Sequence, residues 1–317
     1  MTMRRRTLLS LGLAGTAAAG ASALGIGQAL AGPRPGHGRP RQGGTAPTDP
    51  FAVGVREFQW NRGDRRLVTR VFYPATGAAG GGPVRDAPLA DGVFPVCEFS
   101  HGLGGSPESY GALVLPLAEA GFIVPAPVFP TTSGGTEGNV GDVYNGNQSK
   151  DVSEVISRTL ALNDTAGDPF AGRMALDAGV GAAGHSLGGM TTHGLLSAWP
   201  DPRITAAVPF ACIDMGDPSP DVKAKVLFVH GDQDTLTHFD LARQAYAELP
   251  APKAFMTHTG VGHHEYIWGG PNTGATLETY LDWMRWGLYG DTAARDRLAD
   301  DAAVPGVVWE ADLGVRG

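Results

Sequence analysis

The chain of 317 residues is 42% hydrophobic and 18% charged, and its formal net charge is −8. This composition allows a substantial buried core and excludes an intrinsically disordered protein. The 47 glycines follow no three-residue period, which excludes a collagen-like chain. The negative charge disfavours nucleic acid and anionic membranes as partners.

The first 31 residues differ in texture from the rest of the chain. Three consecutive arginines (residues 4–6) precede an uncharged stretch rich in Gly, Ala and Leu, which ends in Ala29-Leu30-Ala31, a small-x-small cleavage signature. Twin arginines followed by leucines resemble a bacterial twin-arginine export signal, which predicts a secreted or extracytoplasmic protein. The alternative is a membrane anchor that is never cleaved. Cleavage after Ala31 would remove three positive charges and no negative ones, changing the net charge from −8 to −11.

We expect residues 32–50 to be a disordered linker, because they are rich in Pro and Gly and show no apolar pattern. Residues 51–317 then form a single domain, and a monomer is favoured. Nothing after the signal is long and apolar enough to span a bilayer, so no stable membrane insertion is expected once the signal is cleaved. Cys97 and Cys212 adjoin apolar runs that indicate buried strands, and we expect both to be free.

The predicted elements begin with an antiparallel hairpin. Residues 51–74 alternate between apolar and polar side chains around a turn at 61–64, and residues 75–92 are loop-like. Short apolar runs then alternate with helix-length segments, which predicts an α/β fold with a mostly parallel sheet and helices on both faces. The predicted strands span residues 94–99, 122–125, 180–183, 204–212, 226–229 and 254–257. The predicted helices span residues 110–120, 151–162, 187–199 and 276–288, and a Gly/Thr/Asn-rich loop spans 130–148.

The motif Gly184-His185-Ser186-Leu187-Gly188 fits the G-x-S-x-G pattern and lies between a predicted strand and a predicted helix. In this context the serine occupies a sharp, strained turn, and the glycines remove Cβ atoms that would clash with neighbouring segments. The helix that begins here points free N–H groups at the site and favours developing negative charge. We therefore identify Ser186 as the candidate nucleophile of a serine hydrolase.

A serine nucleophile needs a general base and an acid that orients the base, and in this context they follow in the order Ser, Asp/Glu, His. The strand predicted at 226–229 leads into the segment H-G-D-Q-D at residues 230–234. Asp234 is the candidate acid, because G-x-x-D after this strand is the usual arrangement. Asp232 is the alternative, and its other role would be to stabilise the turn.

The candidate base is His263, which directly follows Gly-x-Gly after the strand predicted at 254–257. His264 is the alternative. His101 and His185 flank the site and are expected to support or pack against it. A metal site at residues 263–265 would lack the i, i+4 histidine spacing of H-E-x-x-H, and no cysteine–histidine set supports zinc. We therefore expect neither a metal nor a cofactor.

An oxyanion hole needs two preorganised N–H donors. One candidate is the backbone N–H of Leu187, directly after the nucleophile. The other is the N–H of Leu103, in the glycine-rich segment that follows the strand predicted at 94–99. Gly102 and Gly104 are the alternatives for this second donor.

With these residues identified, the chain resembles the α/β-hydrolase superfamily over roughly residues 53–295. The motifs that carry the resemblance are F-S-H-G-L-G-G, G-H-S-L-G-G, H-G-D-Q-D and G-V-G-H-H. The nearest branches are the bacterial dienelactone-hydrolase-like, platelet-activating-factor-acetylhydrolase-like and polyester-hydrolase or cutinase-like enzymes. The resemblance implies a mostly parallel sheet of about eight strands, flanked by helices, and carboxylic ester hydrolysis without a cofactor.

The sequence departs from these branches in three places. Its nucleophile is Ser186, where dienelactone hydrolases use cysteine. No cysteine follows Cys212, although cutinase-like polyesterases usually have a C-terminal disulfide. Leu103 stands where the oxyanion loop of those polyesterases tends to carry an aromatic residue.

We therefore expect an exported serine esterase that acts on a small-molecule or polymeric ester. One alternative is an acyltransferase, or a polyester or lipid esterase, that uses the same triad. An alternative of a different class is a non-catalytic binding protein with the same fold. The aromatic residues Phe129, Tyr266 and Trp268 either line the substrate pocket or belong to the rim or the core.

Overall fold

The computed structural model describes residues 45–314. The predicted signal segment, residues 1–31, and most of the predicted linker lie outside the described residues. Residues 45–50 have no regular structure, but Ala46 is buried and its N–H donates to Asp291 Oδ2 at 3.2 Å. This end of the predicted linker therefore contacts the domain.

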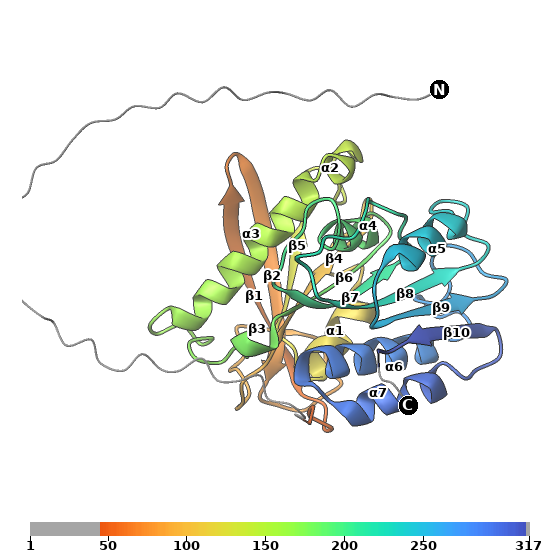
Figure 1. The fold of residues 1–317 in the computed structure, drawn as a ribbon. Helices are drawn as coiled ribbons and strands as arrows, with labels where there is room; N and C mark the ends of the chain where they lie inside the picture. Colours follow the sequence, from red (N-terminus) through yellow and green to blue (C-terminus); the bar gives the residue numbers. More distant parts are fainter. Residues whose placement is uncertain (1–44, 315–317) are drawn as a thin grey trace, which may run out of the picture. The chain divides into compact units, whose positions relative to one another are not determined.

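The predicted hairpin is confirmed as β1 (Ala52–Arg62) and β2 (Arg65–Ala75), the two long antiparallel strands in Figure 1. At its turn Gly63 takes a positive φ of 61°, which glycine adopts without strain. The segment predicted as a loop, 75–92, contains a single two-residue strand, β3 (Val84–Arg85).

The remaining elements alternate between strands and helices, as predicted. The strands are β4 (Val96–Ser100), β5 (Val124–Val128), β6 (Val180–His185), β7 (Ile204–Phe210), β8 (Lys225–Gly231), β9 (Lys253–His258) and β10 (Val307–Asp312). The helices are α1 (Gly111–Glu119), α2 (Gly141–Tyr144), α3 (Asn147–Ala161), α4 (Leu187–Gly194), α5 (Phe239–Glu248), α6 (Thr273–Met284) and α7 (Thr292–Asp301). Short 3₁₀ turns at Leu162–Asp164 and Leu176–Ala178 and a π-helical turn at Arg285–Tyr289 complete the set. Three of these elements, α5, α7 and β10, were not predicted from the sequence, and α2 lies within the predicted loop 130–148.

Two sheets lie side by side, with strand orders β3-β1-β2-β5 and β10-β9-β8-β7-β6-β4. In the six-stranded sheet, β4, β6, β7, β8 and β9 are parallel to one another and only β10 is antiparallel. The mostly parallel α/β fold is therefore confirmed. The expected single sheet of about eight strands is not continuous. Among the described residues, the backbone hydrogen bonds that join the two sheets are from Ile123 N–H to Pro95 O and from Cys97 N–H to Ile123 O, each at 2.9 Å.

The break between the sheets follows from two prolines in β5. Ile123 lies beside β4 and directs both its N–H and its C=O toward that strand. Residues of the same parity, Pro125 and Pro127, face β4 in the same way along an extended strand. Because proline has no N–H, neither can donate to β4, and the ladder stops after Ile123.

Helices cover both faces of the six-stranded sheet, with α1, α6 and α7 on one side and α3, α4 and α5 on the other (Figure 1). Alternate residues of β4 show the two cores. Phe99 packs in a buried cluster with Trp283 of α6, whereas Val96 packs in a second cluster with Ile156 of α3 and Met190 of α4. Cys97 and Cys212 are buried and unpaired, as predicted.

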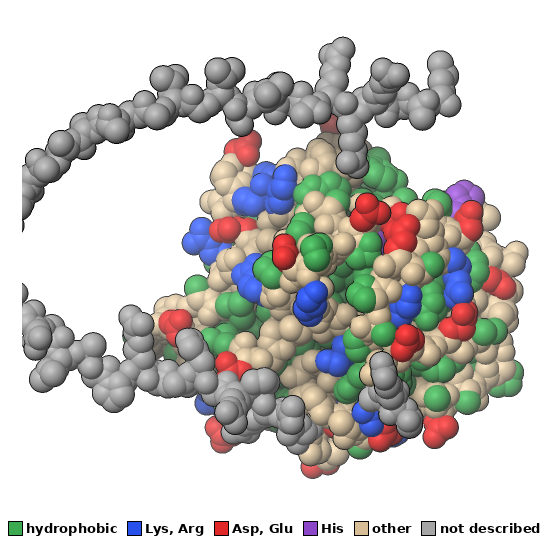
Figure 2. All heavy atoms as spheres, in the orientation of Figure 1, with side chains coloured by type: hydrophobic (Ala, Val, Ile, Leu, Met, Phe, Trp, Pro, Cys, Tyr) green, Lys and Arg blue, Asp and Glu red, His purple; other side chains and the backbone are tan. Residues whose placement is uncertain are grey.

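The surface carries charges of both signs. On the face shown in Figure 2, acidic and basic side chains are interspersed with apolar ones. Within residues 45–314, no helix has the length and apolar character needed to cross a membrane.

Candidate active site

Ser186 lies at the turn between β6 and α4, the position expected for a nucleophile elbow. Its backbone is strained, with φ 59° and ψ −121°, a conformation that residues other than glycine rarely adopt. A Cβ atom at Gly188 would overlap the carbonyl oxygen of Ser100, and one at Gly184 would overlap the carbonyl oxygen of Gly188. The glycines of the motif are therefore required by close backbone approach around the serine.

Asp234, in the loop after β8, accepts a hydrogen bond from His263 Nδ1 on its Oδ2 atom at 2.6 Å. The Thr237 hydroxyl donates to the same oxygen at 2.7 Å, and the amides of Leu236 and Thr237 donate to Oδ1 at 2.8 and 3.0 Å. The side chain of Asp234 is fully buried. The structure thus joins two of the predicted site residues through a direct contact.

The pKa of Asp234 shows that its carboxyl is ionised in this setting. Burial alone would raise this pKa, but hydrogen bonds from His230, His263 and Thr237 outweigh the desolvation and hold it well below its usual range. An ionised carboxylate can only accept, so His263 carries its proton on Nδ1. That tautomer leaves Nε2 of His263 with a free lone pair, as a general base requires.

The alternatives to these two residues lie elsewhere. Asp232 accepts the N–H of Gly260 at 2.7 Å, so its carboxylate joins two loops and does not contact His263. The ring of His264 is exposed and lies beside Trp268, with 5.6 Å between ring centroids. The geometry favours Asp234 and His263 as a pair, and their catalytic roles stay predictions.

The predicted oxyanion loop, residues 101–105, packs directly on Ser186, because a Cβ atom at Gly102 would lie 3.2 Å from Ser186 Cβ. Within residues 45–314, neither the N–H of Leu103 nor that of Leu187 donates a hydrogen bond to another protein group. Both amides are thus free for an oxyanion. Of the alternatives, Gly104 donates its N–H to Thr132 O at 2.7 Å and is already engaged.

His101 holds this loop in place. Its Nε2 accepts the N–H of Phe129 at 3.2 Å, so the ring proton lies on Nδ1 and is donated to Gly102 O at 2.7 Å. Burial lowers the pKa of His101 to about 4, which keeps the ring neutral. These two contacts fit the supporting role expected for His101 from the sequence.

His185, the residue before Ser186, contacts the segment that carries the candidate base. Among the described residues, no hydrogen bond joins Ser186 Oγ to His263 Nε2, and such contacts often shorten only when substrate binds. Instead, His185 Nε2 lies 2.8 Å from His263 O, and the two rings are 4.7 Å apart between centroids. The Tyr110 hydroxyl lies 2.9 Å from the other nitrogen of His185.

Sequence reasoning missed Thr237, His230 and Tyr110 as parts of this site. His230 Nε2 lies 2.7 Å from Thr237 O and 3.3 Å from Asp234 Oδ2, so it helps to fix the acid loop. The only signal in the sequence is that His230 and Thr237 lie beside the motif that contains Asp234. Tyr110 has no such signal, because it comes from a different part of the chain.

The three aromatic residues considered for the substrate pocket separate into two groups. Phe129 and Tyr266 are fully buried in the core, whereas Trp268 is 41% exposed and stands against Tyr110 and His185 at the site. Trp268 is therefore the aromatic rim of the site.

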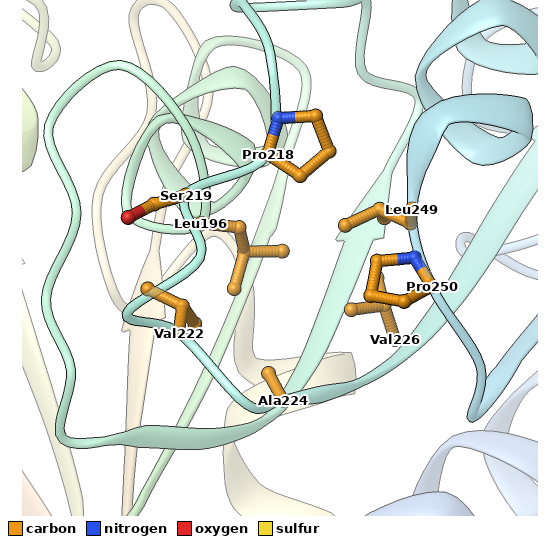
Figure 3. A pocket seen from close by; sticks show the side chains of 8 residues that line it. All are labelled: Leu196, Pro218, Ser219, Val222, Ala224, Val226, Leu249 and Pro250. Atoms are coloured by element: carbon orange, nitrogen blue, oxygen red, sulfur yellow. The ribbon is translucent and has the colours of Figure 1, made fainter.

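A small apolar pocket elsewhere in the molecule has no catalytic character (Figure 3). It is lined by Leu196, Pro218, Ser219, Val222, Ala224, Val226, Leu249 and Pro250. Ser219 is its single polar side chain, and none of the predicted site residues reaches it. Within residues 45–314, no group of three His, Cys, Asp or Glu side chains is arranged to hold a metal ion.

The comparisons with known proteins give one match, to a family model that covers part of the chain. A family model described as platelet-activating factor acetylhydrolase, isoform II, matches residues 84–136, which include β4, the oxyanion loop and β5. The match ends before the three candidate triad residues. No curated protein matches the chain significantly. The matched family supports a serine ester hydrolase. Over residues 84–136 the chain is similar to this family, which confirms the resemblance to the platelet-activating-factor-acetylhydrolase-like branch of the α/β-hydrolase superfamily.

Proposed function

We propose that this protein is an exported serine hydrolase that cleaves carboxylic esters with the triad Ser186, His263 and Asp234. The observation that carries the proposal is the 2.6 Å contact between Asp234 and His263, and the strained φ of 59° at Ser186 supports it. Three motifs far apart in the sequence supply these residues, each after a parallel strand. Such convergence supports nucleophilic catalysis over a purely structural role.

The proposed mechanism has two acyl-transfer steps. His263 takes the proton of the Ser186 hydroxyl on Nε2 as the oxygen attacks the ester carbonyl. The amides of Leu103 and Leu187 stabilise the oxyanion of the tetrahedral intermediate, and one such donor contributes roughly 10²–10³ in rate. His263 then protonates the leaving alcohol, and water releases the acyl group from the serine by the same route.

Two further parts of the proposal concern substrate and location. The name of the matched family supports an ester with a short acyl group as substrate. The arginines at residues 4–6 and the small-x-small signature ending at Ala31 support export and removal of residues 1–31.

The direct test is Ser186→Ala, assayed on a chromogenic short-chain ester. We expect hydrolysis to fall to background while the circular dichroism spectrum stays unchanged, because the substitution removes only the attacking oxygen. Ser157→Ala, which changes an exposed serine of α3, is the matched control and should keep full activity. Hydrolysis by Ser186→Ala at the rate of the unmodified protein would contradict the proposal.

A further inference from the structure

A buried chain of hydrogen bonds connects Tyr110, His185 and the main chain of His263. The Tyr110 hydroxyl lies 2.9 Å from His185 Nδ1, and His185 Nε2 lies 2.8 Å from the carbonyl oxygen of His263. Tyr110 is 6% exposed and His185 is 2% exposed, so water does not compete for these bonds. We call this set the histidine tether.

The direction of each bond in the histidine tether follows from its end. The carbonyl of His263 can only accept, so His185 carries its proton on Nε2 and donates it there. Nδ1 of His185 is then an acceptor, and the Tyr110 hydroxyl donates to it. Burial lowers the pKa of His185 to about 3, so the ring stays neutral and keeps this tautomer.

The tether joins the two halves of the reaction site. His185 is the residue before Ser186, and it is held on β6 by the same strained turn. The side chain of His263 is fixed by Asp234, whose loop follows β8. The hydrogen bond from His185 to the carbonyl of His263 fixes the main chain of His263 as well, and its donor lies on β6, the strand that leads into Ser186.

Trp268 covers the solvent-facing side of the tether. Its ring meets those of Tyr110 and His185 edge-on, at 5.2 and 5.4 Å between centroids. The backbone N–H of Trp268 also bonds to His264 O at 3.3 Å, so the cover is part of the loop that carries the base.

From this arrangement we propose that His185, oriented by Tyr110, is a positioning residue that holds the main chain of His263 against the nucleophile turn. This inference rests on the proposed function, because the tether is inferred to set the distance between His263 Nε2 and Ser186 Oγ. His185 itself exchanges no proton in the reaction. Its effect is on the geometry of the attack and therefore on kcat rather than on KM.

Kinetics of three variants test the tether. His185→Phe removes the donor, and we expect kcat to fall about 10- to 100-fold with KM changed less than about twofold. His185→Gln places an amide N–H at similar reach and should restore kcat to within about fivefold of the unmodified protein. Tyr110→Phe, which removes only the orienting hydroxyl, should lower kcat about 3- to 10-fold.

Tyr289→Phe is the matched control, since it also deletes a hydroxyl bond, a partly buried one to Gly121 O at 2.6 Å, far along the sequence from the site. It should leave kcat unchanged. The inference is overturned if His185→Phe and Tyr110→Phe both keep the kcat of the unmodified protein, or if His185→Gln loses as much as His185→Phe. Should His185→Phe fail to fold, Tyr110→Phe decides the question on its own.

A second readout separates this inference from the proposed function. The proton between His263 Nδ1 and Asp234 should give a downfield signal in proton NMR, absent in Asp234→Asn. We expect Tyr110→Phe to broaden this signal through faster exchange with water, and Tyr289→Phe to leave it sharp. If the unmodified protein hydrolyses no ester, the proposed function fails while the NMR signal still reports the positioning of His263. A signal equally sharp in Tyr110→Phe would overturn the tether.

Discussion

At the scale of single residues, the site depends on buried groups whose protonation is fixed by their partners. Asp234 stays ionised because four hydrogen bonds are donated to its two oxygens, and His230 Nε2 lies 3.3 Å from Oδ2. His101 and His185 stay neutral because burial lowers their pKa values to about 4 and about 3. Each of these histidines therefore keeps one tautomer and one set of partners. The motifs predicted which residues meet, but a tautomer depends on the atom that faces each nitrogen, which spacing cannot supply.

Glu98 is a buried carboxyl that the proposed mechanism does not use. It lies in β4, fully buried; its Oε1 accepts from the Ser100 hydroxyl at 2.8 Å, and its Oε2 has no partner among residues 45–314. Burial raises the pKa of Glu98 well above its usual range, and the bond from Ser100 offsets this only in part. The folded protein therefore keeps the proton of Glu98 at pH values where an exposed glutamic acid has lost it.

This predicts a pH-dependent cost in stability. Above the unfolded-state pKa of about 4.3, the unfolded chain releases the proton of Glu98 and the folded chain keeps it, so stability falls as pH rises, by at most about 1.4 kcal/mol per unit. Glu98→Gln removes this term, so its melting temperature should exceed that of the unmodified protein by a margin that grows from pH 5 to pH 8. Glu137→Gln, in an exposed loop, should show no such trend. A margin that is constant across this range would contradict the account.

At the scale of elements, an ion-pair network ties the β1–β2 hairpin to α2 and α3. Arg65 bonds Asp142 and Asp151 at 2.6 Å each, and Arg62 bonds Asp151 at 2.7 Å. The side chain of Asp151 is fully buried. Gln148 continues the connection inward, donating to Thr191 of α4 at 2.9 Å. The segment predicted as an open loop, 130–148, is therefore fixed against the helix that follows the nucleophile.

Removing Arg65 should loosen this attachment. Arg65→Gln leaves Asp151 with Arg62 alone, so we expect the free energy of unfolding to fall by about 2–3 kcal/mol, below the 3–5 kcal/mol typical of an orphaned buried charge. Arg85→Gln breaks an exposed pair of 3.7 Å with Asp86 and should change it by less than about 0.5 kcal/mol. Chemical denaturation of both variants measures the difference. Equal losses in the two would contradict the structural role assigned to Arg65.

The elements that sequence analysis missed share a weak apolar signal. In α5 the fully buried residues are Ala242 and Ala245, which are too small to mark a core-facing stripe. In α7 they are Ala294 and Leu298, and β10 is largely exposed at the edge of the sheet. The interruption between the two sheets was also not predicted. The prolines of β5 reveal it only when the strands on either side of β5 are known, because only then is it clear which hydrogen bonds they cannot make.

At the scale of the whole molecule, the fold explains why sequence motifs could predict a candidate site. The loops after β4, β6, β8 and β9 contribute the oxyanion loop, Ser186, Asp234 and His263. The carboxyl ends of parallel strands lie at one edge of the sheet, so motifs that follow such strands converge there. The histidine tether could not be predicted, because no motif marks Tyr110, the residue before α1, or the carbonyl oxygen of His263 as a contact of His185.

The most direct test of the central claim is labelling with a fluorophosphonate probe, followed by peptide mapping. We predict a single adduct on Ser186, and a labelling rate that falls more than about a thousandfold in His263→Ala but stays near that of the unmodified protein in His264→Ala. An adduct on another residue, or full labelling of His263→Ala, would contradict the assignment of Ser186 as a nucleophile activated by His263.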